Sequence, residues 1–153
     1  MPAGAPLRLY GTLSDKPWLD WAWVQGQLES AGTYWVVPLT QGHPHLRPVW
    51  GIWQDDRIYL SIGSPAARRA LARDPAVTVH LDSGTDVVIV EGLAIPAVSH
   101  GAPIVAYNQK YDWEYDPEEY GPLQCVKPLV VRAWRTAGWA GRESFTETGR
   151  WDF

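Results

Sequence analysis

The stretch from Gly42 to Gly63 constrains the fold most, because it carries an interrupted strand and a hairpin directly ahead of a helix start. Residues 45–53 and 57–62 are apolar enough for strands, and the polar turn Gln54-Asp55-Asp56 joins them as a hairpin. Pro48 cannot donate to a strand ladder, which predicts an edge, a bulge or a break. An irregular strand leaves backbone groups free to meet a ligand. A plain edge strand explains this proline equally well.

A helix is predicted directly after this hairpin, over residues 64–73. Its serine suits the N-cap and the following proline the first turn. Asp74-Pro75 ends it, since the residue before a proline avoids the helical region. A helix N-terminus attracts phosphate, and Arg68 and Arg69 add guanidinium groups that match phosphate geometry. The two arginines are also compatible with solvated charges that bind nothing.

Short apolar runs separated by turns continue through the chain. One helix is predicted between an Asp15 cap and a Gly32 stop, and a second over residues 99–111, followed by an acidic loop. Gly92 indicates a bulge or a sharp bend inside its strand. The further strands are predicted at residues 33–39, 77–81, 86–95 and 123–134, with one more in the tail.

Six or seven strands with short connections predict a mainly β fold, a β-barrel with peripheral helices. The chain lacks the βαβ alternation of a doubly wound sheet, which argues against that class. Residues 1–14 carry little pattern and are predicted as an N-terminal arm. Residues 15–153 are predicted as a single domain, since 153 residues fit one core.

The composition narrows the partners and the compartment. A net charge of −4 argues against nucleic acid as the main partner. Cys125 stands alone, so no intrachain disulfide forms and a cytoplasmic location is expected. We expect neither a signal peptide nor a membrane span. The ten tryptophans fit either a core and an interface or a site for a flat ligand.

The familiar catalytic motifs do not occur. The chain has no Gly-x-Gly-x-x-Gly, no Walker lysine and no Gly-x-Ser-x-Gly elbow. The acidic residues after Tyr111 are interpreted as a solvated loop rather than an acid/base pair. No catalytic residue and no metal site is therefore predicted. The four histidines, which lack the spacing of a zinc site, are His43, His45, His80 and His100.

These residues resemble the pyridoxamine 5′-phosphate oxidase-like superfamily, and more narrowly its small flavin- or deazaflavin-dependent split-barrel proteins. The resemblance covers about residues 30–153. The motifs that carry it are Gly42-x-Pro44-x-x-x-Pro48-Val49-Trp50-Gly51-x-Trp53, Asp56-Arg57-x-Tyr59, Leu71-x-Arg73-Asp74-Pro75-x-Val77-x-Val79-His80-Leu81, Asp86-Val87-Val88-Ile89-Val90-Glu91-Gly92-x-Ala94, Tyr107-x-x-Lys110-Tyr111 and Thr148-x-Arg150-Trp151-x-Phe153.

The resemblance implies a six-stranded split β-barrel of the FMN-binding type that pairs as a homodimer. It implies FMN or coenzyme F420 in a groove between subunits, with residues 47–51 along the ring system and 61–64 near the ribityl or phosphate group. The second subunit would add aromatic and basic residues. The implied cofactor-binding residues are Arg47, Pro48, Val49, Trp50, Ser61, Ile62, Gly63, Ser64, Arg68, Arg69, Lys110, Trp139 and Arg150, with Trp151 beside them.

The chain departs from the family pattern in the helix that follows the hairpin. Many members have a phosphate-binding lysine at the position of Ala67 and an asparagine at that of Ala70. A further difference lies in the first strand, where Val37 stands in place of a threonine that is common in the family. The substrate signature of pyridoxamine phosphate oxidase itself is missing from the C-terminus. The expected function is an oxidoreductase that uses FMN or F420 to transfer hydride to or from a small, planar substrate. The alternative is a non-catalytic split-barrel protein that binds or senses flavin or haem.

Overall fold

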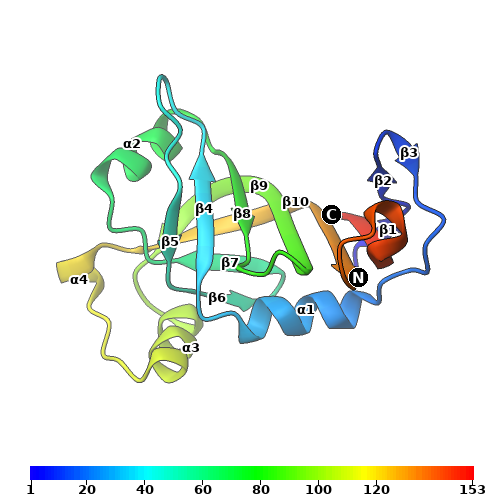
Figure 1. Cartoon of the computed structure of the whole chain (residues 1–153). Coiled ribbons are helices and arrows are strands. Elements are labelled where there is room, and N and C mark those ends of the chain that lie inside the picture. Colours follow the sequence, from blue (N-terminus) through cyan, green and yellow to red (C-terminus); the bar gives the residue numbers. More distant parts are fainter.

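The computed structural model describes residues 1–153 as a curved antiparallel sheet with peripheral helices (Figure 1). The helices are α1 (Trp21–Ser30), α2 (Pro65–Arg73), α3 (Ala102–Tyr111), α4 (Pro117–Tyr120) and the 3₁₀ helix η1 (Gly141–Ser144). The strands are β1 (Ala3–Ala5), β2 (Arg8–Leu9), β3 (Thr12–Leu13), β4 (Tyr34–Pro38), β5 (Arg47–Val49), β6 (Gly51–Gln54), β7 (Arg57–Leu60), β8 (Ala76–His80), β9 (Asp86–Val98), β10 (Leu123–Thr136) and β11 (Phe145–Asp152).

Strand pairing closes the sheet into a barrel. The hydrogen-bonded order runs β5-β4-β8-β9-β10, and the first part of β10 also pairs with β7. Strand β7 pairs with β6, which continues from β5 across Trp50. The ring therefore has six strand positions, with β5 and β6 sharing the last, as the sequence predicted. Closure removes free sheet edges along most of the ring.

The predicted strand 45–53 is two strands. β5 pairs with β4, where Pro48 lies opposite Trp35, whereas β6 pairs with β7. The strand thus breaks at Trp50, because its two halves bond to different neighbours. The hairpin after it turns at Asp55 and Asp56, whose φ angles of 50° and 53° match a two-residue type I′ turn.

Helix α1 begins later than the sequence predicted. Its N-cap is Asp20, whose carboxylate accepts from the N–H of Ala22; Asp15 does not cap it. Thr148 of β11 holds the preceding segment extended, accepting from the N–H of Leu19 and donating its own N–H to the carbonyl of Pro17. This pairing with a distant strand overrides the local capping signal. The helix then lies along one end of the barrel (Figure 1) and buries its apolar face in the core.

Helix α2 forms where the sequence predicted it. The Ser64 hydroxyl accepts from the N–H of Ala67, and a proline occupies the first turn. Ala67, Ala70 and Leu71 are buried. The polar face, with its arginines, turns to solvent.

The N-terminal arm is attached to the sheet rather than free. β1 pairs with β11, so that Gly4 lies opposite Trp151. The short hairpin of β2 and β3, η1 and both chain ends gather on the side away from α2 and α3 (Figure 1). The predicted tail strand is β11, which pairs along β10.

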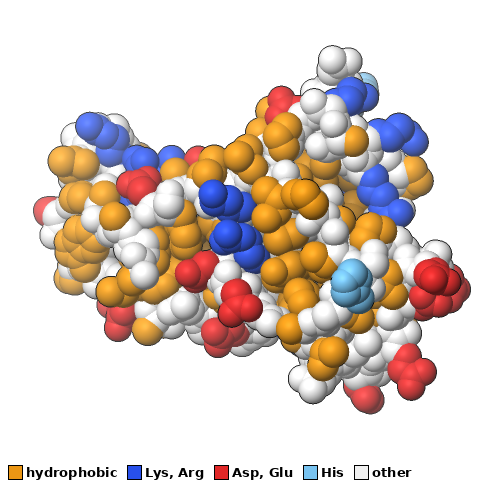
Figure 2. All heavy atoms as spheres, turned by 180° about the vertical axis from the view of Figure 1, so that it is seen from behind, with side chains coloured by type: hydrophobic (Ala, Val, Ile, Leu, Met, Phe, Trp, Pro, Cys, Tyr) orange, Lys and Arg blue, Asp and Glu red, His pale blue; other side chains and the backbone are white.

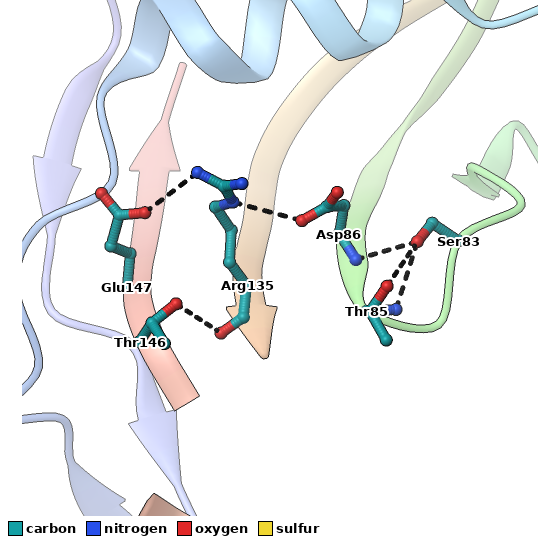
Figure 3. A network of polar contacts seen from close by, with 6 residues as sticks. All are labelled: Ser83, Thr85, Asp86, Arg135, Thr146 and Glu147. Atoms are coloured by element: carbon teal, nitrogen blue, oxygen red, sulfur yellow. Dashed lines mark hydrogen bonds and ion pairs between the residues drawn. The ribbon is translucent and has the colours of Figure 1, made fainter. Parts of the chain in front are cut away.

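Two long strands, β9 and β10, carry most of the barrel's curvature. Gly92 lies opposite Pro128, next to a register shift between Pro128 and Val130, as its predicted bulge requires. Further along, Arg135 of β10 lies between Asp86 of β9 and Glu147 of β11, at 3.2 and 3.3 Å (Figure 3). These ion pairs tie three neighbouring strands on a solvent-facing side.

No helix is long and apolar enough to cross a membrane. No group of three or more His, Cys, Asp or Glu side chains is placed to hold a metal ion. Cys125 is buried and unpaired.

Candidate functional site

A groove of about 510 Å³ opens where the barrel strand breaks. One side comes from β5 and Trp50, and the other from the segment between β7 and α2. The lining residues are Arg47, Pro48, Val49, Trp50, Ser61, Ile62, Gly63, Ser64, Tyr107 and Trp113. Its size is typical of a small-molecule site. Eight of these residues belong to the predicted set, so that part of the set lies together around one hollow.

The indole of Trp50 forms an exposed aromatic wall of this groove. It stacks on the ring of Tyr111 with a centroid distance of 4.7 Å and an interplanar angle of 7°. Trp113 meets it edge to face at 5.7 Å. The main chain beside Trp50 is paired too, because the N–H of Ser61 donates to its carbonyl at 2.9 Å. The groove therefore presents a flat, oriented aromatic surface beside a hydroxyl-bearing strand end.

Polar contacts behind Trp50 fix the break in the strand. The hydroxyl of Tyr111 accepts from the N–H of Gly51 at 2.9 Å and lies 2.8 Å from the carbonyl oxygen of the same residue. The ammonium of Lys110 donates to that carbonyl at 3.0 Å and to the Tyr34 hydroxyl at 3.3 Å. Lys110, predicted to bind cofactor, thus lies behind the wall and does not line the groove.

Burial controls the protonation of this cluster. Desolvation lowers the pKa of Lys110 to about 8. Desolvation, with Tyr111 and Glu29 nearby, raises the pKa of Tyr34. Burial raises the pKa of Tyr111 as well, against the opposing effect of its hydrogen bond to Gly51. At neutral pH the cluster therefore holds one half-buried ammonium, that of Lys110, among un-ionised phenols.

Arg47 is the one cationic side chain that lines the groove. It is exposed, and its sole hydrogen bond within the chain goes to the adjacent carbonyl of Leu46. Ser64 and the N-terminus of α2 lie on the opposite wall. A basic side chain and a helix N-terminus facing one hollow suit a phosphate or carboxylate.

The predicted arginines of α2 are placed differently. The Arg68 guanidinium is tied to backbone carbonyls, donating from Nε to Ile62 and from a terminal nitrogen to Tyr120 at 2.6 Å. Arg69 is exposed on the helix, and neither arginine lines the groove. Ala67, the position of the family lysine, is fully buried, so a lysine there would point into the core. Within one chain, Arg47 is the basic side chain that lines the groove.

Two further predicted residues lie away from the groove. Trp139, 90% exposed, lies in the connection between β10 and β11 and borders a separate hollow of about 220 Å³. Arg150 of β11 pairs with Asp152 at 2.8 Å. The resemblance implies that both act from a second subunit, and a single chain does not test this.

The sequence did not predict two groove residues, Tyr107 and Trp113. Tyr107 comes from α3 and Trp113 from the loop after it, and α3 packs against Ile52 of β6 and Leu123 of β10. Both are far along the chain from the hairpin, so no spacing linked them to it. The signal available was the aromatic density of residues 107–120, a stretch that was predicted as the end of a helix and an acidic loop.

Comparisons with known proteins bear on the fold. No protein-family model matches the chain, and no curated protein matches it in sequence. An F420 reductase superposes with a TM-score of 0.57 at 19% identity, over 70% of this chain and 94% of that one. A putative pyridoxamine 5′-phosphate oxidase from Listeria innocua gives 0.57 at 20% identity, over 73% and 95%. An FAD-binding protein from Mesorhizobium loti gives 0.56 at 13% identity, over 86% and 94%.

At such low identities the likeness shows the fold alone. The chain is a split β-barrel of the type found in the pyridoxamine 5′-phosphate oxidase-like proteins, which confirms the prediction from its motifs. The activities named for these neighbours belong to them.

Proposed function

We propose that this chain binds a flavin or deazaflavin, FMN or F420, in the groove at Trp50 and transfers hydride between it and a small planar substrate. The observation that carries the proposal is the joint presence of an oriented aromatic wall, an unpaired arginine and a helix N-terminus around one hollow. The neighbours in fold include an F420 reductase and an FAD-binding protein, which supports this class of cofactor.

The residues present fit such a cofactor. Trp50 and Trp113 offer flat apolar surface for a ring system, and Arg47 with the start of α2 offers positive potential for a phosphate. The cofactor, when bound, supplies the hydride chemistry. The chain orients the ring against Trp50, neutralises the phosphate through Arg47 and excludes water along the aromatic wall.

A second candidate, non-catalytic binding or sensing of a flavin or haem, is favoured by one observation. The groove lining includes no Asp, Glu, His, Cys or Lys, so the fully buried phenol of Tyr107 is its only general acid or base of the usual kinds. Hydride transfer to a ring needs no such group, and neither does simple binding. Turnover separates the two candidates: reduction of a bound cofactor by a chemical hydride donor, followed by its reoxidation by planar acceptors, marks the enzyme.

We also propose that the working form is a cytoplasmic homodimer. A second apolar hollow, about 300 Å³, lies on the outer sheet face, with Leu39 and Leu129 exposed beside it. Figure 2 shows hydrophobic side chains spread over the rear face, interrupted by a cluster of Lys and Arg. A second copy would cover such a surface. Light scattering should give twice the chain mass, and Leu129→Asp should shift it toward the monomer.

Binding is tested by adding FMN, FAD and F420 separately and following tryptophan quenching. We expect at least one dissociation constant below about 100 μM, which corresponds to about −5.5 kcal/mol. Arg47→Ala should weaken binding about tenfold and flatten its salt dependence. Arg69→Ala, an exposed arginine outside the groove, is the matched control and should change little. Failure of all three cofactors to bind would overturn the proposed function.

A further inference from the structure

The phenol of Tyr107 is an unusual feature of the groove floor. The side chain is fully buried yet borders the groove, and its oxygen is a buried polar atom without a hydrogen-bond partner. A buried polar group without a partner is costly, and native structures leave few of them. Tyr115 packs beside Tyr107 in the same buried cluster, with Ile52 and Leu123. Its hydroxyl, by contrast, has a partner, because it donates to the carbonyl of Gly121 at 2.7 Å.

The Ser61 hydroxyl is the polar side-chain group that acts on the pKa of this phenol against burial. Burial raises the pKa of Tyr107 to about 12, and Ser61 opposes that rise, although the two groups do not complete a hydrogen bond of normal geometry. The phenol is thus protonated across the physiological range and has a proton to donate. Ser61 itself is half-buried and lines the groove, so it stands between the phenol and the open space.

The position of Ser61 determines which part of a ligand these hydroxyls meet. Its N–H donates to the carbonyl of Trp50, which holds Ser61 directly beside the main chain of the aromatic wall, whereas Ser64 caps α2 three residues further on. A flat ring resting against Trp50 and Trp113 therefore brings its edge to Ser61. An acceptor atom at that edge would complete the chain of donors that begins at Tyr107.

We infer that Tyr107 and Ser61 form a coupled pair of hydroxyls at the groove floor. The pair hydrogen-bonds a carbonyl oxygen or ring nitrogen at the edge of a planar ligand that rests against Trp50 and Trp113. Tyr107 is the positioning residue: it donates to the Ser61 oxygen, which frees the Ser61 proton for the ligand. The inference rests on the proposed function and deepens it, because it makes a ring-edge acceptor the feature that the site selects.

A pair of small probes tests this selectivity without any phosphate or cofactor. Coumarin carries a ring-edge carbonyl, and naphthalene has a similar fused-ring shape without oxygen. Titrations followed by NMR shifts should show that the wild-type protein prefers coumarin by about tenfold. Tyr107→Phe and Ser61→Ala should each remove most of that preference and leave the affinity for naphthalene unchanged. The double variant should lose no more than either single one, since the two hydroxyls act as a unit.

The stability of the ligand-free protein provides an independent readout. Tyr107→Phe removes an unpartnered hydroxyl, so its melting temperature should equal or exceed that of the wild type. Tyr115→Phe, the matched control, removes a satisfied hydroxyl from the same cluster. It should lower the melting temperature while keeping the coumarin preference.

The outcomes separate this inference from the proposed function. Equal affinity for coumarin and naphthalene in the wild type, no coumarin binding up to its solubility, or a full preference retained in Tyr107→Phe overturns the inference, whether or not flavins bind. A coumarin preference that depends on Tyr107, in a protein that binds no flavin, upholds the inference for planar acceptor-bearing ligands and overturns the flavin assignment.

Discussion

The ammonium of Lys110 lies 3.0 Å from the main-chain carbonyl oxygen of Gly51, directly behind the groove wall formed by Trp50. None of the ion pairs in the chain includes this lysine. Its neighbours are the ring of Tyr34, 5.1 Å from the ammonium, and that of Tyr111 at 5.5 Å. The Lys110 ammonium is thus held by one carbonyl, one hydroxyl and two aromatic faces. The protonation of this α3 side chain is therefore coupled to the conformation of the strand break at Trp50.

We predict that this lysine makes folding stability depend on pH. Burial lowers its pKa to about 8 in the folded chain, against about 10.4 when unfolded. Between these values the unfolded chain binds more protons, so the lysine's contribution to the free energy of unfolding rises with pH and is least favourable below pH 8. Urea unfolding of the wild type and Lys110→Met at pH 7, 8, 9 and 10 should show the difference between them growing in favour of the wild type.

The comparison with the variant is needed because Tyr34 and Tyr111 titrate in the opposite sense. Their raised pKa values make the folded chain bind more protons at high pH, which lowers stability in both proteins. A stability difference that stays constant from pH 7 to pH 10 would contradict the prediction.

The Tyr111 hydroxyl should stabilise both the fold and the groove. Tyr111→Phe leaves the stack on Trp50 possible but removes the contacts to the N–H and carbonyl of Gly51. We expect a loss of about 1–3 kcal/mol in the free energy of unfolding, because buried backbone groups lose their partner. Cofactor affinity should fall several-fold, as the Trp50 wall is less well held. Tyr10→Phe, at a tyrosine 71% exposed, is the control and should behave as wild type in denaturant titrations.

The parts of the fold that the sequence predicted depend on local physics. The cap at Ser64 and the turn at Asp55-Asp56 are set by a few adjacent residues, and both form as expected. The predicted start of α1 was wrong because the N–H of Leu19 donates a hydrogen bond to the carbonyl of Thr148, a partner that no local pattern reveals. The break at Trp50 was one of three outcomes compatible with Pro48, and only the change of strand partner decides among them.

The residues of the candidate site show the same contrast between local signals and long-range contacts. Residues on the hairpin and helix start were found because the chain itself brings them together. Tyr107 and Trp113 were missed because α3 is folded against β6 by contacts between segments far apart in sequence. Arg68 was assigned to the phosphate from its guanidinium group and its place near a helix N-terminus, whereas the structure commits it to the carbonyls of Ile62 and Tyr120.

That commitment predicts that the two arginines of α2 have different roles. Arg68→Ala should lower the free energy of unfolding by about 1–3 kcal/mol, since two carbonyls lose a charged donor. Arg69→Ala should change it by less than about 0.5 kcal/mol, as is usual for an exposed side chain. Chemical unfolding of both variants checks this. If instead Arg68→Ala leaves stability unchanged and weakens FMN or F420 binding, the arginine reaches the groove in solution. The structural role assigned to it would then be wrong.

Gly92 should be the least tolerant position of the barrel strands. A Cβ built there would lie 2.4 Å from the carbonyl oxygen of Lys127 and 3.1 Å from a methyl carbon of Val126. The first contact is with backbone in the paired strand β10, which no side-chain rotation can relieve. Gly92→Ala should therefore cost about 1–3 kcal/mol of stability through forced displacement at the bulge. Gly26→Ala in helix α1, where nothing lies within 4 Å, is the matched control and should stabilise by up to about 1 kcal/mol. Thermal unfolding of the two variants should move in opposite directions; a Gly92→Ala protein as stable as wild type would mean that β9 and β10 separate at the bulge in solution.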